Sequence, residues 1–319
     1  MKKILITGVK GFVCSNLTQF LVEKYPNILF VGIDCNSYCA CDDNIKDIML
    51  KENFIYTDLD ITDVSKLTSL FSTYRFTYVY HLAAYSFVDR SFSNPSEVFQ
   101  NNTVGTANIL ECSRLFKVSK FIQMSTDEVY GDKYIVADEN SILNPTNPYS
   151  GSKASGDIFI ISYVNGYEFP AIIIRCNNIY GIRQYPEKVI PKFILSILKE
   201  TKCVIHNGGN QVRTFIHIDD FCSAFDIICN DGKIGEVYNI GSQDEMTING
   251  LFQMMNDRIV NKYGVKSIEP ELINGGRQYN DKHYTINYDK LNNLGWKQKK
   301  NLEESIEDII IWYYDKYFG

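Results

Sequence analysis

The stretch KKILITGVKGFV, residues 2–13, decides the fold class of this chain. It predicts a short apolar strand over 2–7, a tight turn with glycines at Gly8 and Gly11, and then a helix. Glycines between a strand and a helix let the backbone approach a bound pyrophosphate at the helix N-terminus. The stretch therefore predicts the first strand–helix unit of a dinucleotide-binding domain.

Further strands and helices alternate along the chain from this first unit. Expected strands cover residues 28–33, 54–56, 78–82, 120–124 and 170–175, and expected helices cover about 64–73, 95–115 and 149–164. Nearly continuous apolar strands that alternate with helices are typical of a parallel sheet covered on both faces. We therefore expect an α/β fold, a Rossmann-type doubly wound parallel sheet.

Acidic residues after the expected strands indicate which dinucleotide binds. Asp34 follows the second strand, 26 residues after Gly8. A carboxylate there can bind the adenosine ribose hydroxyls and would repel a 2′-phosphate, which predicts NAD rather than NADP as the cofactor. An acid past the third strand could accept from the adenine amino group. Either Asp60 beside Ile61 or Asp58 beside Leu59 could do so, and a helix cap or an exposed acid is the alternative for both.

The alternation loosens after about residue 180. Helices are expected over 191–199, 247–263 and 302–314, with a strand over 237–240. We expect two interwoven parts. The first is an NAD-binding Rossmann domain over 1–176, with contributions from about 212–242. The second is a smaller, mixed substrate-binding region over 177–319.

Composition narrows the class of protein. The 319 residues are 45% hydrophobic and 22% charged, with a net charge of −6. No Lys/Arg run and no apolar run of about 18 residues is present, so neither nucleic acid nor a membrane is an expected partner. Nine Cys without a secretory signal indicate free thiols and a cytoplasmic setting. Cys39-Ala40-Cys41 lacks a second Cys/His pair, so no metal is expected.

Three side chains could form an oxidation site. Thr126 follows the strand over 120–124, and Tyr149 and Lys153 are four residues apart, on one face of the expected helix. A nearby ammonium and a positive nicotinamide would stabilise the Tyr149 phenolate, which could then take a proton from an alcohol. Lys153 could also hold the nicotinamide ribose, and Thr126 could bind the substrate oxygen.

Asp127 and Glu128 indicate a further chemical step. Hydride transfer needs no second acid–base pair, whereas a ketone makes the adjacent C–H acidic. One carboxylate could remove that proton while a neighbouring carboxylic acid protonates a leaving hydroxyl, which requires different pKa values for two close acids. The alternative is a solvated turn with a capping Asp.

Cations and an amide in the second half could hold an anionic diphosphate, which an acidic protein must bind with locally gathered charge. The candidates are Asn178, Lys188, Arg213 and Arg277. His206 and His217 are interpreted as structural.

The whole chain resembles the extended short-chain dehydrogenase/reductases, and within them the nucleoside-diphosphate-glucose 4,6-dehydratases. The resemblance runs to about residue 296 and is carried by the motifs ITGVKGFV, HLAAYSFVD, STDEVYG, NPTNPYSGSK, NNIYG, YPEKVIPKFI, QVRTFIHIDD, EVYNIGS and LGW. The Asp-Glu pair after Thr126 is its most discriminating part, because related epimerases usually lack that pair.

The resemblance implies a role for each matching residue. Thr126, Tyr149 and Lys153 would form the oxidoreductase triad, with Asp127 the acid at the 6-hydroxyl and Glu128 the base at carbon 5. The NAD site would comprise Gly8, Gly11, Phe12, Val13, Asp34, Asp60, Ile61, Ala83, Ala84, Tyr149 and Lys153. The sugar-nucleotide site would comprise Ser86, Asn178, Lys188, Arg213 and Arg277.

Three positions depart from the family pattern. Cys14 stands where the third glycine of the cofactor turn is usual, and Phe87 stands where many relatives have His. The run Arg277-Gln278-Tyr279 differs from the usual Arg-Pro-Gly/Asn. Phe87 is therefore not assigned to the site.

The resemblance implies an NAD-dependent 4,6-dehydratase that converts UDP-glucose, or dTDP-glucose, to the 4-keto-6-deoxy nucleotide sugar, an early step towards rhamnose-type sugars. Motif similarity to eukaryotic-type enzymes favours UDP-glucose. A homodimer through the helices around 95–115 and 149–164 is also implied. A sugar-nucleotide 4-epimerase and a non-catalytic NAD-sensing protein are the alternatives.

Overall fold

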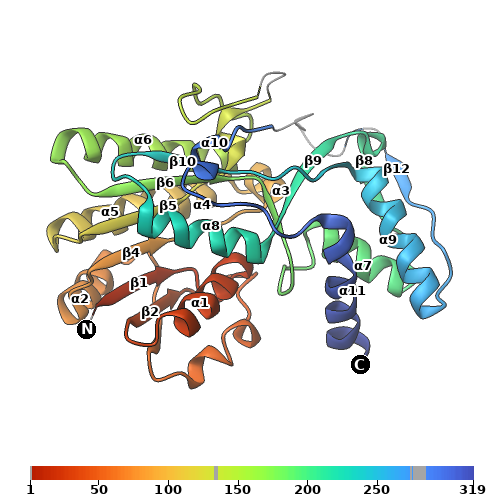
Figure 1. Ribbon diagram of the computed structural model, residues 1–319, viewed down its shortest axis with the longest axis horizontal. Coiled ribbons are helices and arrows are strands. Elements are labelled where there is room, and N and C mark those ends of the chain that lie inside the picture. Colours follow the sequence, from red (N-terminus) through yellow and green to blue (C-terminus); the bar gives the residue numbers. More distant parts are fainter. Residues whose placement is uncertain (1, 133–135, 274, 276–284) are drawn as a thin grey trace.

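The computed structural model describes residues 2–132, 136–273, 275 and 285–319, and one parallel sheet forms its centre (Figure 1). Seven strands lie in the order β10-β6-β5-β4-β1-β2-β3, and all their pairings are parallel. Their bounds are β1 Lys3–Thr7, β2 Leu29–Asp34, β3 Phe54–Asp58, β4 Tyr78–His81, β5 Lys120–Met124, β6 Ala171–Cys176 and β10 Val237–Ile240. The strand order reverses between β1 and β4, so the predicted doubly wound fold is confirmed.

Helices cover both faces of this sheet because its strands bury apolar side chains on both sides. On β1, Ile4 and Ile6 belong to the core that includes Phe225, whereas Leu5 belongs to the opposite core with Ile109. The helices packed around the sheet are α1 Phe12–Lys24, α2 Val64–Tyr74, α5 Gly105–Leu115, α6 Pro148–Tyr167 and α8 Ile218–Asp231.

The helix expected over 95–115 is interrupted in the structure. It consists of α4 Pro95–Phe99, a π-helical turn η3 Gln100–Val104, and α5, and it follows the short helix α3 Val88–Ser93. Within the π-helical turn, Asn102 is buried. Its side chain accepts from Tyr85 N at 2.8 Å and donates to Tyr85 O and Ser152 Oγ, each at 3.0 Å. The turn therefore joins the loop after β4 to α6.

A second, smaller lobe lies beside the sheet, on the right in Figure 1. Its helices α7 Val189–Leu198, α9 Ile248–Tyr263 and α11 Leu302–Phe318 share one apolar core. Its short strands form the sheets β11-β9-β7 and β12-β8. They are β7 Asn178–Tyr180, β8 Val204–His206, β9 Val212–His217, β11 Glu245–Thr247 and β12 Glu271–Ile273. These three- to six-residue strands carry too little periodicity to be predicted from sequence.

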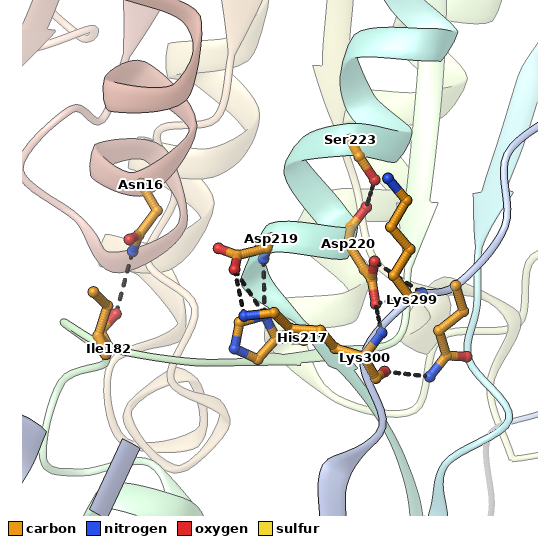
Figure 2. Close-up of polar contacts among 9 residues, drawn as sticks. Asn16, Ile182, His217, Asp219, Asp220, Ser223, Lys299 and Lys300 are labelled. Carbon is orange, nitrogen blue, oxygen red and sulfur yellow. Dashed lines mark hydrogen bonds and ion pairs between the residues drawn. The ribbon is translucent and has the colours of Figure 1, made fainter. Parts of the chain in front are cut away.

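The segment that enters α11 is attached to the N-terminus of α8 (Figure 2). The Asp220 carboxylate accepts from the backbone N–H groups of Lys299 at 3.1 Å and of Lys300 at 2.8 Å. His217 Nδ1 accepts from Asp219 N at 3.1 Å and caps α8, which gives this histidine a structural partner. Asn16 on α1 donates to Ile182 O at 3.2 Å. The bond from Asn16 to Ile182 connects the two halves of the chain, whereas the Asp220 bonds hold together two segments of the second half.

The remaining short elements are the 3-10 turns η1 Asp42–Asn44, η2 Ile48–Leu50, η4 Asp127–Tyr130 and η5 Asn207–Gly209, and the helix α10 Asp289–Asn292. Among the residues with described coordinates, no helix is both long and apolar enough to cross a membrane.

Candidate active site

A cavity of about 480 Å³ lies over the carboxyl ends of the strands, between the sheet and the smaller lobe. Most of the residues predicted to form a site line it: Gly8, Gly11, Phe12, Val13, Asp34, Ile61, Ala83, Ala84, Ser86, Thr126, Asp127, Glu128, Tyr149, Lys153, Asn178, Lys188 and Arg213. Asp60 is not among the lining residues, and Arg277 lies outside the described residues. Within the described part of the chain, no group of His, Cys, Asp or Glu could hold a metal ion.

The glycine turn requires a residue without a side chain at Gly8. Its φ is +86°, and an added Cβ would lie 2.9 Å from Cα of Ala83. Gly11 caps the N-terminus of α1. Cys14, at the third position of the motif, is buried, and its thiol donates to Thr7 O at 3.3 Å. A small buried side chain therefore fits at the third position of the motif.

Asp34 lies at the end of β2, where a ribose could reach it. Its Oδ2 accepts from Lys10 N at 2.8 Å. Burial raises the pKa of Asp34 to about 6, and the hydrogen bond from Lys10 N opposes that rise. The Lys10 ammonium is bonded to Asn36 Oδ1 and Asp42, both at 2.6 Å. The positive charge of Lys10 nevertheless acts on Asp34 and lowers its pKa, against the effect of burial.

The two acids after β3 have partners of their own. Asp60 Oδ1 accepts from both the N–H and the hydroxyl of Thr62 at 2.8 Å, and its side chain is exposed. Asp58 accepts from Asn36 Nδ2 at 2.8 Å. The cavity is instead lined here by Leu59 and Ile61. Each carboxylate has a second oxygen beside the one in these bonds, so it could accept a further hydrogen bond from an adenine amino group.

Thr126 caps the N-terminus of the turn η4 and lies between the predicted oxidation site and the predicted acid pair. Its hydroxyl accepts from Glu128 N at 3.3 Å and donates to Asp127 Oδ1 at 3.2 Å. A hydrogen bond with Thr126 also lowers the pKa of Tyr149. Thr126 is therefore hydrogen-bonded to residues of both predicted groups, Tyr149 and the two acids.

Asp127 and Glu128 have different surroundings. Asp127 is 3% exposed, and Asn177 Nδ2 donates to its Oδ2 at 2.7 Å. Burial raises the pKa of Asp127 to about 7, and the neighbouring charge of Glu128 contributes to the rise. Glu128 accepts from Asn147 Nδ2 at 2.9 Å. The buried acid can thus carry a proton near neutral pH, as a general acid must.

Asn147 and Asn177 were not predicted to belong to the site. Asn147 has a recognisable sequence signal, because with Ser150 it forms a capping box at the start of α6. Asn177 follows β6, and nothing in its sequence context indicates that it contacts Asp127.

Tyr149 and Lys153 are both buried on α6, as their spacing predicts. In the structure, the groups around Tyr149 shift the pKa of its hydroxyl upward. Burial raises it, and the charge of Glu128 raises it further. Burial also lowers the pKa of Lys153 to about 8. Burial and the nearby carboxylates therefore set the direction of the Tyr149 shift.

A buried hydrogen-bond chain shapes the loop after β4, and sequence reasoning missed it. The Thr7 hydroxyl accepts from Leu82 N and Ala83 N at 3.1 and 3.0 Å, so its proton is directed to His81 Nδ1 at 2.8 Å. His81 Nε2 then donates to Thr106 Oγ1 at 2.9 Å. Burial lowers the pKa of His81 to about 3, so the ring is neutral.

The predicted substrate residues lie on the other side of the cavity. Lys188 Nζ donates to Ser86 O at 2.8 Å and lies 5.6 Å from the ring centre of Phe87. Phe87 thus provides an apolar ring face beside the Lys188 ammonium. Asn178 donates to Thr214 O at 3.3 Å.

The sequence assigned different roles to two further basic residues: Arg213 to the substrate site and His206 to the structure. Arg213 lines the cavity, and its charge lowers the pKa of Asp127. His206 was interpreted as structural, yet it lines the cavity.

Comparisons with known proteins agree with this architecture. A family model described as GDP-mannose 4,6 dehydratase matches residues 5–309. A dTDP-D-glucose 4,6-dehydratase of Dictyostelium discoideum is 39% identical over 98% of this chain and 82% of the relative. A solved dTDP-glucose 4,6-dehydratase of Streptomyces venezuelae, with NAD bound, has a TM-score of 0.92 at 28% identity, covering 99% of this chain and 97% of its own.

A similar fold also occurs with a different reaction. A UDP-glucose 4-epimerase of Thermotoga maritima, solved with UDP-glucose, has a TM-score of 0.89 at 28% identity, covering 98% of this chain and 99% of its own. The fold alone therefore does not distinguish dehydratase from epimerase. The family model nevertheless covers nearly the whole chain, and the predicted family and enzyme class are confirmed. With its doubly wound sheet, glycine turn and Tyr–Lys helix, this chain belongs to the GDP-mannose 4,6-dehydratase family of nucleotide-sugar enzymes.

Proposed function

We propose that this protein is an NAD-dependent 4,6-dehydratase of UDP-glucose or dTDP-glucose. The observation that carries the proposal is the acid pair Asp127–Glu128 next to Thr126, in which one carboxyl is buried and has its pKa raised to about 7. An enzyme that only oxidised and reduced a hydroxyl would need Tyr149 without this pair. Named relatives and NAD-bound neighbours support the same reaction class and cofactor.

The described residues fit NAD. A Cβ at Gly8 would fill the space beside Ala83, and Asp34 can accept from ribose hydroxyls and disfavours a 2′-phosphate. When bound, NAD would take a hydride from sugar carbon 4 and return it to carbon 6. We assign this role to residues 1–176 with the contribution from about 212–242, and sugar-nucleotide binding to residues of 177–319.

The chain's own groups would handle the protons. Tyr149 would take the proton of the 4-hydroxyl, while Thr126 holds the same oxygen and Lys153 holds the cofactor ribose. Because burial raises the pKa of Tyr149, its ionisation depends on positive charge brought in with the cofactor. Glu128 would remove the carbon 5 proton, and Asp127 would protonate the departing 6-hydroxyl, which leaves as water. The proton on Glu128 would exchange with solvent before Glu128 protonates carbon 5, which brings solvent hydrogen to that carbon. Tyr149 would then release its proton and Asp127 would take one up from solvent, which restores both groups.

The diphosphate would bind at the smaller lobe. Lys188 and Arg213 line that side of the cavity, and Ser86 and Asn178 provide neutral hydrogen-bonding groups. Arg277 stays a prediction of the sequence. The sequence motifs favour UDP-glucose, whereas the Dictyostelium relative is named for dTDP-glucose, so both nucleotides belong in the first assay.

Turnover of the two nucleotide sugars tests the proposal. We expect one or both to give the 4-keto-6-deoxy product, with one deuterium incorporated at carbon 5 in deuterated water. Glu128→Gln should abolish both the product and the incorporation, while Glu52→Gln, at an exposed glutamate, should retain them. The absence of a 4-keto-6-deoxy product from either sugar, or normal turnover by Glu128→Gln, would refute the proposal.

A 4-epimerase is the second candidate, favoured by the similar fold of the Thermotoga enzyme. An epimerase would invert carbon 4, keep the 6-hydroxyl and leave carbon 5 unlabelled. It would also tolerate Glu128→Gln. An NAD sensor would turn over neither sugar, and the buried Thr126, Tyr149 and Lys153 argue against it.

We also propose a homodimer. Apolar side chains on the neighbouring helices α4, α5 and α6 are exposed: Phe99, Leu115, Ile158, Phe159 and Tyr167. A second copy packed on this face would bury them. Light scattering should give twice the mass of 36.7 kDa, and Ile158→Glu with Phe159→Glu should give the monomer mass. A wild-type monomer would exclude this interface.

A further inference from the structure

A buried ion pair lies one turn beyond the catalytic lysine. Asp157 follows Lys153 by four residues on α6, so both lie on the helix face that carries Tyr149. Asp157 Oδ2 accepts from Arg175 Nε at 2.9 Å. The two side chains are 0% and 2% exposed. Arg175 belongs to β6, so this ion pair attaches the Tyr–Lys helix to the centre of the sheet.

The same guanidinium reaches the turn that carries the acid pair. Arg175 Nη1 donates to the Tyr130 hydroxyl at 3.0 Å, and the guanidinium lies 4.9 Å from the Tyr130 ring centre. Tyr130 ends η4, the turn that begins with Asp127. Its hydroxyl donates in turn to Asn239 Oδ1 on β10 at 2.8 Å. That hydroxyl therefore accepts one hydrogen bond and donates another, with its proton committed to Asn239.

Arg175 is thus bonded to both elements that carry catalytic groups. We propose that Arg175 and Tyr130 are positioning residues that fix the acid pair on η4 relative to the Tyr149–Lys153 pair on α6. This inference rests on the proposed dehydratase function, in which the two pairs act on neighbouring atoms of one sugar ring.

The geometry of the reaction explains why such a connection matters. Tyr149 acts at the oxygen on carbon 4, whereas Glu128 and Asp127 act at carbon 5 and at the oxygen on carbon 6. Both groups of residues must fit the same bound sugar, and a misplacement of about 1 Å can cost roughly a hundredfold in rate. Loosening η4 alone should therefore slow elimination more than oxidation. A purely structural role would lower stability without separating the two steps.

Tyr130→Phe tests the assignment, because it keeps the ring under the guanidinium and removes the hydroxyl that joins Arg175 to Asn239. With the holoenzyme and the nucleotide sugar that the wild type converts, single-turnover absorbance follows formation of bound NADH, and mass spectrometry follows carbon 5 labelling and product. We expect the rate of NADH formation to stay within about twofold of wild type. The rates of carbon 5 labelling and of product formation should each fall by about tenfold or more.

The matched control is Tyr238→Phe. Tyr238 is a buried tyrosine on β10 whose hydroxyl accepts from Lys233 N at 2.9 Å, away from both catalytic elements. Tyr238→Phe should lose stability as Tyr130→Phe does. Its ratio of the NADH-formation rate to the product-formation rate should stay that of the wild type. An unchanged ratio in Tyr130→Phe, or the same change in Tyr238→Phe, would overturn the inference while leaving the dehydratase function intact. A wild type that makes no 4-keto-6-deoxy product would refute the function and this assignment together.

Discussion

The side-chain amide of Asn177 donates a 2.7 Å hydrogen bond to Oδ2 of Asp127, immediately after β6. This bond opposes the effect of burial, which raises the pKa of Asp127 to about 7. The partner that holds the proposed general acid in place therefore also tunes its protonation. Removing this hydrogen bond should therefore change the pKa of Asp127 in a known direction.

Asn177→Ala should raise the pKa of Asp127 further, because the bond stabilises the charged carboxylate. An acid must be protonated to act, so the alkaline fall of kcat should move to higher pH. The kcat plateau should drop by about tenfold as the carboxyl loses its positioning partner. A pH–rate profile measures both effects. Asn178→Ala, which removes a bond to Thr214 O, should leave the alkaline limb where it is; an unmoved limb in Asn177→Ala would contradict the assigned acid.

Gly8→Ala should weaken NAD binding and cost about 1–3 kcal/mol of unfolding free energy. The reason is the φ of +86° and the 2.9 Å approach of an added Cβ to Ala83. Urea unfolding and NAD titration are the measurements. Gly166→Ala is the control, since no atom lies within 4 Å of its added Cβ, and it should be neutral or stabilising by up to about 1 kcal/mol. Equal stability changes in the two variants would be evidence against the strained turn.

Asp157→Asn should cost about 3–5 kcal/mol of unfolding free energy, because it leaves the charge of Arg175 buried without its counterion. Urea unfolding of the apoprotein measures this loss. Lys202→Met breaks an ion pair whose side chains are 86% and 51% exposed, so it should change stability by less than about 1 kcal/mol. If both variants lost the same small amount, the buried pair would not stabilise the fold as its burial implies.

His81 should make the fold sensitive to acid. Its pKa is about 3 in the folded state, because of burial, and about 6.5 when unfolded. The unfolded chain then binds a proton that the folded chain does not. The stabilising contribution is complete above about pH 6.5 and is lost as the pH falls towards 3, at up to about 1.4 kcal/mol per pH unit. In urea unfolding at a series of pH values, His81→Gln should show a shallower slope over this range, whatever its stability at neutral pH. An unchanged slope would rule out this histidine as the source.

Much of the active site could be predicted because it depends on local patterns. The turn at Gly8 and Gly11, Asp34 at a strand end, and the spacing of Tyr149 and Lys153 each follow from one segment of chain. The cavity brings these residues together, as the carboxyl ends of parallel strands share one edge of a sheet. Asp60 was less predictable, because a carboxylate in a polar loop can bind a neighbour such as Thr62 instead of a ligand.

Contacts between distant segments could not be predicted in this way. The bond from Asn177 to Asp127 spans 50 positions, and that from Arg175 to Tyr130 spans 45. The raised pKa of Tyr149 could not be predicted either, because its burial and its proximity to the Glu128 carboxylate arise only on folding.

The sequence by itself therefore determined the family, the sheet and the candidates for the reacting groups, because these depend on residue type and on periodicity within single segments. Only the tertiary structure decided which acid of the pair is buried and which partners hold each one. It also decided that burial and the charge of Glu128 raise the pKa of Tyr149. Those properties come from desolvation and from charges carried by segments far apart in the chain, which local sequence patterns do not encode.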